Sequence, residues 1–324
     1  MEEKLLDLKT RLAEVADLQQ AAAVLIWDQE TYMPPGGAEA RAMQMGTLSG
    51  LAHQKATDDA VGALLDDLSA ALNGTDADSD EGALVRVTQR EYQKLARTPR
   101  ELVVELAQTL PLSMEAWKKA RETDDFATFL PYLEKVIELR EWQIEVLGPA
   151  ESGDPYDVLL DDYEPGLTTA TIDSVYDALH GPLVELVEGI SAHQDRVDRS
   201  VLLGDFSEEK QMAFSREVAE ALGYDFSRGR IDVSAHPFTI NFGRDDVRIT
   251  TRFDAADPIS AIMSTIHEAG HAIYEQNIAA SLSRTGLDSG AGMATHESQS
   301  RFYENVLGRS RAFWDVWYPR LQAT

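Results

Sequence analysis

Hydrophobic residues recur at every third or fourth position along most of this chain, a spacing that predicts amphipathic helices. The clearest apolar stripe covers residues 2–27, and after a proline–glycine break at 34–37 a second helix is expected over 38–57. Further helical patterns cover residues 83–97, 100–122, 126–148, 169–195 and 207–222. We expect the apolar residues of these helices to lie in the core, for example Leu133, Val136, Ile137 and Leu139.

One later segment alternates with a period of two instead. Apolar residues take alternate positions before a turn at 243–246 and again after it, with Phe238, Ile240 and Phe242 on the first arm. A period of two is typical of half-buried strands, so the two arms predict a β-hairpin over 238–253.

Helical spacing returns after Pro258, and a last helix is expected to begin near Thr295. No internal repeat and no linker rich in proline, glycine or serine divides the chain. The expected fold is therefore mainly α, a large helical single domain over 1–324 with a small β-hairpin or sheet. We expect helices over 1–230 and the hairpin with the last helices over 231–324.

The charge balance limits the partners of this chain. It carries 56 acidic and 29 basic residues, a formal net charge of −27. This charge repels phosphate backbones, so nucleic-acid partners are not expected. Only eight of the basic residues are lysine. Excess acid with few lysines is typical of a protein from a salt-loving source, because salt screens the self-repulsion. The alternative is an acidic protein from an ordinary cell.

Cysteine usage and the N-terminus bear on the compartment. The chain contains no cysteine, which excludes disulfides and thiolate metal sites and agrees with a reducing environment. The acidic N-terminus lacks the basic-then-apolar order of a secretory signal. No apolar run reaches the roughly eighteen residues that a membrane span needs. We therefore expect a cytoplasmic protein with no membrane partner.

Candidate chemistry is concentrated in the segment His267-Glu268-Ala269-Gly270-His271. Residues four apart lie on one face of a helix, so His267 and His271 can direct two imidazoles at one metal ion. Glu268 is turned away from direct ligation but can reach a water on that ion as general base. The pattern is the His-Glu-x-x-His motif of zinc peptidases. The small residues Ala269 and Gly270 inside the motif would also let another backbone or the substrate approach closely.

A catalytic zinc ion needs a third protein ligand. The extended metzincin pattern fails here because Tyr274 and Asn277 stand where it needs glycine and histidine. Glu275 lies two helical turns from the first histidine, too far along the axis to share its ion. Glu297 is favoured because it opens a helix that can pack antiparallel to the first one, and Glu304 is the alternative.

The hairpin directly precedes this motif. An edge strand beside a zinc site can pair with an extended peptide and present its scissile bond to the metal. Arg248 and Arg252 lie on one face by strand alternation. Either guanidinium could hold a substrate carboxylate with two hydrogen bonds. The alternative is that both arginines are surface charges.

Six motifs, in this order and spacing, resemble the M32 family of thermostable carboxypeptidases, and the resemblance covers essentially the entire chain. The motifs are Trp27-Asp28-Gln29-Glu30-Thr31-Tyr32-Met33-Pro34, Tyr163-Glu164-Pro165-Gly166, His236-Pro237-Phe238, Asp246-x-Arg248-x-Thr250, His267-Glu268-x-x-His271 and His296-Glu297-Ser298-Gln299.

The resemblance implies a mostly helical, cytoplasmic, homodimeric enzyme that removes single residues from peptides with a free C-terminus. It implies that His267, His271 and Glu297 bind the metal, with Glu268 as general base and 1–230 forming a groove wall and the dimer region. The metal is expected to be zinc, with cobalt as an alternative. The residues implied for the substrate groove are His236, Asp246, Arg248, Thr250 and His296, with Arg248 as the candidate for the terminal carboxylate.

One departure from the family concerns length. Members are longer, and two of their motifs, one with an arginine and one containing Gln-Asp-x-His-Trp, do not occur in this chain. We therefore expect a chain that lacks the C-terminal third of the family, with a complete metal site and an incomplete groove. Besides a carboxypeptidase, an oligopeptidase with the same metal site remains open. An inactive fragment that serves as a scaffold or partner is the third possibility.

Overall fold

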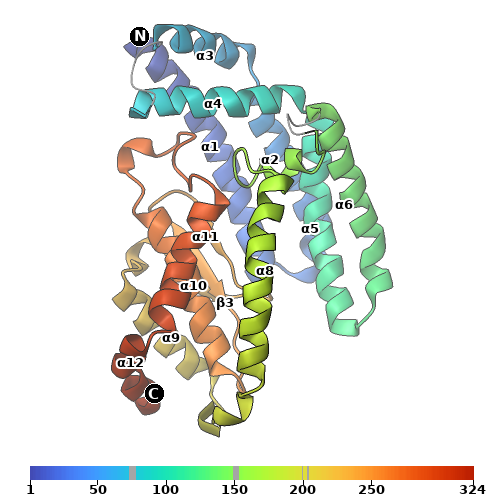
Figure 1. Ribbon diagram of the computed structural model, residues 1–324. Coiled ribbons are helices and arrows are strands. Elements are labelled where there is room, and N and C mark those ends of the chain that lie inside the picture. Colours follow the sequence, from blue (N-terminus) through green and yellow to red (C-terminus); the bar gives the residue numbers. More distant parts are fainter. Residues whose placement is uncertain (73–77, 149–152, 199, 203) are drawn as a thin grey trace.

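Helices make up most of the chain in the computed structural model, which describes residues 1–72, 78–148, 153–198, 200–202 and 204–324 (Figure 1). The α-helices are α1 (Glu2–Thr31), α2 (Ala38–Ala56), α3 (Asp59–Ala71), α4 (Asp80–Arg97), α5 (Arg100–Thr123), α6 (Phe126–Leu147), α7 (Asp157–Leu160), α8 (Thr169–Ser191), α9 (Glu208–Leu222), α10 (Pro258–Gln276), α11 (Met293–Arg301) and α12 (Arg311–Ala323). A π-helix, Phe302–Gly308, joins α11 to the segment before α12. This architecture confirms the predicted mainly-α single domain.

The N-terminal half is a helical body in which α2 packs between α1 and α5, while α6 packs on α5 (Figure 1). The apolar stripe of α1 is buried where predicted, since Leu5 and Leu8 pack on Val61 and Leu65 of α3. Helix α3 was not predicted, because its thirteen residues lie between two longer and clearer patterns.

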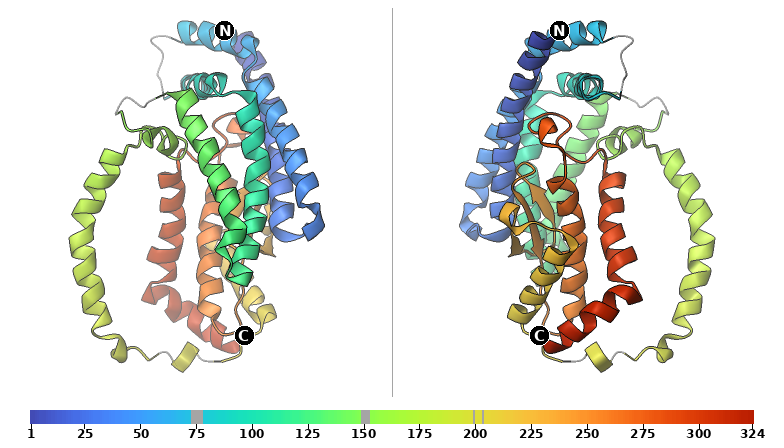
Figure 2. Two further views of the ribbon diagram at one scale, coloured as in Figure 1. Left: turned by 90° about the vertical axis from the view of Figure 1, so that its right-hand side faces the viewer. Right: turned by 90° about the vertical axis from the view of Figure 1, so that its left-hand side faces the viewer.

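In two helices at the edge of the body, apolar residues that were predicted to lie in the core are not buried. In α6 only Leu139 is buried, while Ile137 is 50% exposed. In α8 no residue is buried, although its apolar residues were expected in the core. Figure 2 shows the reason for α8, which stands beside the body as a separate column.

A three-stranded sheet connects the helical body to the last helices. Its strands are β1 (Ile231–Val233), β2 (Thr239–Asn241) and β3 (Val247–Thr251), in the order β1-β3-β2. The antiparallel pairing of β2 with β3 confirms the predicted hairpin. The parallel pairing of β1 with β3 was not predicted, because three residues are too few to show an alternation.

Helix α10 is the central element of the C-terminal half. Val247 and Ile249 of β3 pack on one side of α10 against Ala269 and Ala272. On another side, Ile262 and Ile266 of α10 pack with Phe214 of α9 and Trp317 of α12. A helix that is apolar on several sides is stabilised by such burial. None of the helices within the described ranges is both long and apolar enough to cross a membrane.

Candidate metal centre

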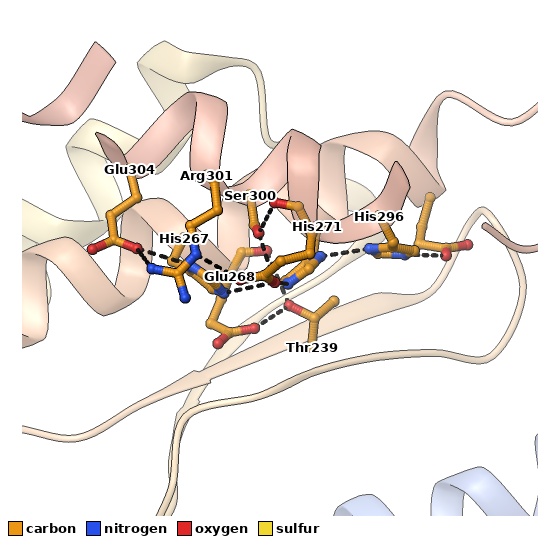
Figure 3. A network of polar contacts seen from close by, with 10 residues as sticks. Thr239, His267, Glu268, His271, His296, Ser300, Arg301 and Glu304 are labelled. Atoms are coloured by element: carbon orange, nitrogen blue, oxygen red, sulfur yellow. Dashed lines mark hydrogen bonds and ion pairs between the residues drawn. The ribbon is translucent and has the colours of Figure 1, made fainter. Parts of the chain in front are cut away.

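The two histidines proposed as metal ligands lie on α10, whose N-terminal end is capped. Pro258 occupies the first turn of α10, where its missing N–H is tolerated, and the Asp257 carboxylate accepts from Ser260 N at 3.2 Å. The helix places His267 and His271 one turn apart with ring centroids 4.9 Å from each other (Figure 3). The sequence prediction that both rings share one face is therefore met by the geometry.

Three groups converge beside this helix. The Glu297 Oε2 atom of α11 lies 3.6 Å from His267 Nε2 and 3.3 Å from His271 Nε2. One ligand atom from each residue lies within 4.8 Å of the other two, a spacing that suits a single metal ion. Two imidazole nitrogens and one carboxylate oxygen are a ligand set of catalytic zinc sites.

The other nitrogen of each histidine is occupied by a neighbour. His267 Nδ1 lies 2.9 Å from Glu304 Oε2, and His271 Nδ1 lies 2.5 Å from His296 Nδ1. His296 Nε2 in turn lies 2.6 Å from Glu275 Oε1, so a buried carboxylate ends this chain of contacts (Figure 3). These contacts fix the orientation of both rings and leave the Nε2 atoms facing Glu297.

This geometry bears on the choice between Glu297 and Glu304 as third ligand. Glu304 lies on the Nδ1 side of His267, away from the Nε2 cluster, and its carboxylate accepts from Arg309 at 2.5 Å and Arg301 at 3.3 Å. Although burial raises its pKa, the hydrogen bonds from Arg309 and His267 give Glu304 a net lowered pKa. Because Glu304 contacts His267 Nδ1 and Glu297 lies beside both Nε2 atoms, the geometry favours Glu297 as the ligand and Glu304 as a support for His267.

The protonation of the ligands also fits a metal. Burial, with the neighbouring His296 and His267, lowers the pKa of His271 to about 4. Its imidazole is therefore neutral at pH 7, the form that binds metal. Burial raises the pKa of Glu297, but hydrogen bonds from Arg301 and Ser300 outweigh it and lower the pKa overall.

The candidate general base, Glu268, is buried between α10 and the sheet. It is 7% exposed, and its Oε2 atom accepts from the Thr239 hydroxyl of β2 at 2.6 Å (Figure 3). Burial raises the pKa of Glu268, while the Thr239 hydrogen bond works in the opposite direction. A carboxyl group with a raised pKa is suited to take up and return a proton near neutral pH.

Helix α11 is held by close contacts with α10 and with Glu164. At Gly270 an added Cβ would lie 2.8 Å from the Ser300 Cα atom, so only glycine allows this packing. At the N-terminus of α11 the Glu164 carboxylate accepts from Ala294 N at 2.8 Å. A Cβ at Gly292 would lie 2.5 Å from that carboxylate.

The support from Glu164 was not anticipated from the sequence. Tyr163 adds to it, because its carbonyl accepts from Met293 N at 2.8 Å. Both contacts satisfy backbone N–H groups that a helix leaves unpaired in its first turn. The only signal was the Tyr163-Glu164-Pro165-Gly166 motif, whose structural purpose its sequence alone does not reveal.

The site opens onto a large cavity of about 1770 Å³. Glu268, His271 and Glu297 lie in its wall, with Phe238 and Thr239 of the β2 region beside them. The remaining walls come from α4, the 161–166 segment and the 286–293 loop. A cavity of this size has room for a segment of peptide beside the three converging groups.

Arg248 lies on the other side of the sheet from this cavity. Thr239 opposes Ile249 in the register, and both face α10, so Arg248 faces the α1 side by strand alternation. Its guanidinium donates to Asp246 at 2.8 and 2.7 Å and lies 4.3 Å from the Trp27 ring centroid. The structure therefore brings Arg248 and Asp246 together but does not place them beside the metal residues.

Of the other three residues implied for the groove, His296 lies in the cavity wall, whereas Thr250 and His236 do not. Thr250 is fully buried, and its hydroxyl oxygen accepts from Phe238 N at 2.9 Å. This hydrogen bond holds the segment that carries Thr239. Because Thr250 is fully buried, it cannot contact a substrate directly. Within the described part of the chain, exposed His236 is not in the cavity wall, whereas His296 is. Arg252 follows the end of β3 and is exposed.

Comparisons with known proteins agree with this geometry. A family model described as Carboxypeptidase Taq (M32) metallopeptidase matches residues 7–324. Carboxypeptidase 1 of Bacillus subtilis is 39% identical over 311 residues, which are 96% of this chain and 61% of that protein. Thermostable carboxypeptidase 1 of Thermus thermophilus is 39% identical over 314 residues, 95% of this chain and 62% of that protein.

Solved structures share the fold as well as the sequence. The structure titled "BsuCP Crystal Structure" superimposes with a TM-score of 0.94 at 37% identity, covering 99% of this chain and 64% of that one. The M32 carboxypeptidase of Deinococcus radiodurans R1 gives a TM-score of 0.85 at 38% identity over 99% of this chain and 63% of that one. This chain thus spans about three fifths of the curated relatives that it matches. Because the family model matches nearly all of it, the chain belongs to the M32 family of metallopeptidases.

Proposed function

We propose that this protein is a metal-dependent carboxypeptidase that removes single residues from peptides with a free C-terminus and broad side-chain specificity. The observation that carries the proposal is the convergence of two histidine Nε2 atoms and one Glu297 oxygen beside the buried Glu268. His271, Glu268 and Glu297 of this group lie in the wall of a cavity. Membership of the M32 family supports the same reaction class.

The proposed metal is zinc, with cobalt as an alternative, held by His267, His271 and Glu297. Three nitrogen and oxygen ligands leave one position open, as catalytic zinc sites require. Bound there, the metal supplies a Lewis acid that polarises a carbonyl group and lowers the pKa of water. Glu304 and His296 keep the two ligand rings in position through their Nδ1 atoms.

Glu268 is the proposed general base. Thr239 holds its Oε2 atom, so the carboxylate keeps one orientation while its other oxygen is available to the attacking water. Glu268 takes a proton from that water as the last peptide bond is attacked, and returns it to the departing amine. The products are one free amino acid and a peptide shortened by one residue.

For Arg248 we propose a supporting role rather than direct contact with the terminal carboxylate. Both of its hydrogen bonds go to Asp246, and the rings of Trp27 and Phe242 lie 4.3 and 4.8 Å from its guanidinium carbon. This cluster joins the α1 end of the helical body to β3. It therefore stabilises the sheet that positions Thr239.

We further propose a homodimer that acts in the cytoplasm, with residues 1–230 as one groove wall and 231–324 as the metal-bearing part. The cavity supports this division, since α4 and the 161–166 segment face β2, α10 and α11 across it. Neither nucleic acid nor a membrane is a proposed partner, given the net charge of −27.

The deciding experiment uses purified 1–324. Metal content is measured by mass spectrometry, and hydrolysis is followed on matched peptides with a free or an amidated C-terminus. A carboxypeptidase releases one residue from the free peptide and leaves the amidated peptide intact. Glu268→Gln is the control, since it should keep the metal and lose the activity.

Each alternative has its own result in that experiment. Cleavage of both peptides would identify an oligopeptidase with the same metal site. Bound metal without turnover of either peptide would identify a scaffold or partner role. That role has a specific basis, because the chain spans only 61% of the Bacillus relative.

A further inference from the structure

Arg301, the last residue of α11, contacts two carboxylates of the candidate metal centre (Figure 3). Its Nε atom donates to Glu297 Oε1 at 2.6 Å, and its Nη1 atom donates to Glu304 Oε2 at 3.3 Å. Glu297 is the proposed third metal ligand, and Glu304 supports His267 through the Nδ1 atom of the ring. One guanidinium therefore joins a metal ligand to the carboxylate that orients another ligand.

The two carboxylate oxygens of Glu297 have different partners. Oε2 faces the Nε2 atoms of His267 and His271 at 3.6 and 3.3 Å, while Oε1 accepts from Arg301. The hydroxyl of buried Ser300 lies 3.0 Å from Oε2. Because a carboxylate oxygen has more than one lone pair, Oε2 can keep this contact and still bind a metal. The carboxylate is thus held at both oxygens, with Oε2 directed at the two imidazoles.

The local helix geometry explains how Arg301 reaches both carboxylates. It follows Glu297 by four residues, a spacing that makes two side chains neighbours on a helix surface. The π-helix Phe302–Gly308 begins directly after Arg301, and Glu304 belongs to it. Such segments occur frequently at functional sites. In this one, the Glu304 carboxylate contacts both Arg301 and His267.

The contact at Oε1 limits how Glu297 can bind a metal. A carboxylate coordinates a metal ion through one oxygen or through both. A catalytic zinc ion has three protein ligands and keeps its fourth position for water or substrate. A second oxygen from Glu297 would compete for that open position. The charge-assisted hydrogen bond from Arg301 gives Oε1 a different partner and so disfavours this competition.

The alternative is an ordinary surface ion pair, because the side chain of Arg301 is 53% exposed. Exposed ion pairs contribute little to the free energy of unfolding. The side chains of its partners are less exposed, at 39% for Glu297 and 11% for Glu304. Substitution of the exposed arginine should therefore leave the fold intact. A role in metal coordination and a role as a surface charge then differ in what happens to the bound metal.

We propose that Arg301 is a positioning residue, which binds Oε1 of Glu297 so that this carboxylate offers the metal Oε2 alone. The proposal rests on the proposed metal-dependent function and adds a residue to it. Arg301 acts through Glu297 and not on the substrate. Its effect is to keep a coordination position open for the water that Glu268 deprotonates.

The visible spectrum of the cobalt-loaded protein tests this proposal without any measurement of activity. The purified protein is stripped of metal, loaded with cobalt and compared with Arg301→Met, whose side chain keeps the aliphatic stem but cannot donate. We expect the visible absorption of Arg301→Met to fall at least about twofold, because a fifth ligand atom weakens the bands of four-coordinate cobalt. X-ray absorption of the zinc form of the same variant should show an additional oxygen neighbour. Arg301→Lys should keep the wild-type spectrum, since an ammonium at this helical spacing can still donate to Oε1.

Arg309→Met is the matched control. Arg309 is 55% exposed and donates to Glu304 Oε1 at 2.5 Å, so this variant removes the same charge from the same network but leaves the Oε1 contact of Glu297 in place. Its cobalt spectrum should equal that of the wild type. An unchanged spectrum of cobalt-loaded Arg301→Met, or an equal change in Arg309→Met, would overturn the proposal. Failure of the wild-type protein to take up cobalt would instead refute the metal-dependent function itself, and this proposal with it.

Discussion

Gly270 is the point at which the packing of two helices controls the metal geometry. It lies between the two histidines of the motif, and α11 crosses α10 at this position. A Cβ on residue 270 would lie 2.8 Å from Ser300 Cα, 3.2 Å from the Gln299 carbonyl and 3.2 Å from Tyr303 Cβ. Two of these three atoms belong to the backbone, so Gly270→Ala cannot be accommodated by a side-chain rotation.

The size of the effect follows from these distances. Carbon atoms in contact normally lie about 3.5–4.0 Å apart, so α11 must move by roughly 1 Å. Overpacking of this kind costs about 1–3 kcal/mol, and the better helix propensity of alanine returns up to about 1 kcal/mol. Glu297 lies on α11, so the movement also separates its carboxylate from both histidines. A net loss of about 1–2 kcal/mol at the site corresponds to roughly 5–30-fold weaker metal binding.

The assay is zinc affinity by competition with a fluorescent chelator, with circular dichroism to establish that the variant is folded. Gly189→Ala in α8 is the matched control, because a Cβ there has no atom within 4 Å. The control should keep the wild-type zinc affinity and gain up to about 1 kcal/mol of stability. The reasoning fails if folded Gly270→Ala binds zinc as tightly as the wild type does.

Four further results are expected. Glu268→Gln should lower kcat by at least about 10²-fold, the usual contribution of a general base, while zinc content by mass spectrometry stays unchanged. Glu304→Gln should weaken zinc binding about 10–100-fold in the chelator assay, because His267 loses the carboxylate 2.9 Å from its Nδ1 atom. In metal-free protein the free energy of unfolding, measured in urea, should fall as the pH drops from about 6.5 to about 4. Burial and two neighbouring histidines lower the pKa of His271 in the folded protein to about 4. Over this pH range His271 is therefore protonated in the unfolded chain but not in the folded one, which favours unfolding. Melting temperature should rise between low and molar salt, because salt screens the net charge of −27, and a flat response would contradict the salt-loving interpretation.

Much of the candidate centre could be predicted because its spacing is local. The positions of His267, Glu268 and His271 depend only on helical geometry, and α10 holds them one turn apart as expected. The choice of Glu297 as the third metal ligand required one further assumption, that the helix carrying it packs on the helix of the two histidines. The sequence supported it through Gly270, the small residue at which the helices cross.

The supports of the centre could not be predicted in the same way because they are distant in sequence. Glu164 caps α11 from 130 residues away, and Thr239 reaches Glu268 from a strand. Strand alternation placed Arg248 and Arg252 on one face, but the sequence does not say which face of the sheet α10 covers. In the structure α10 covers the face that carries Ile249, so Arg248 lies on the other face, where it contacts Trp27 of α1.

The same distinction explains why α8 differs from the other helices. Its pattern predicted a core helix, and the pattern itself is correct, since the apolar residues form one stripe. Periodicity reports which face of a helix is apolar, but not whether another element of the described chain covers that face. The metal residues face one another inside this chain, whereas the apolar residues of α8 are not buried by any other part of the described ranges. Metal binding should therefore depend on contacts that are already present between α10 and α11, and substitutions of exposed residues on α8 should leave it unchanged.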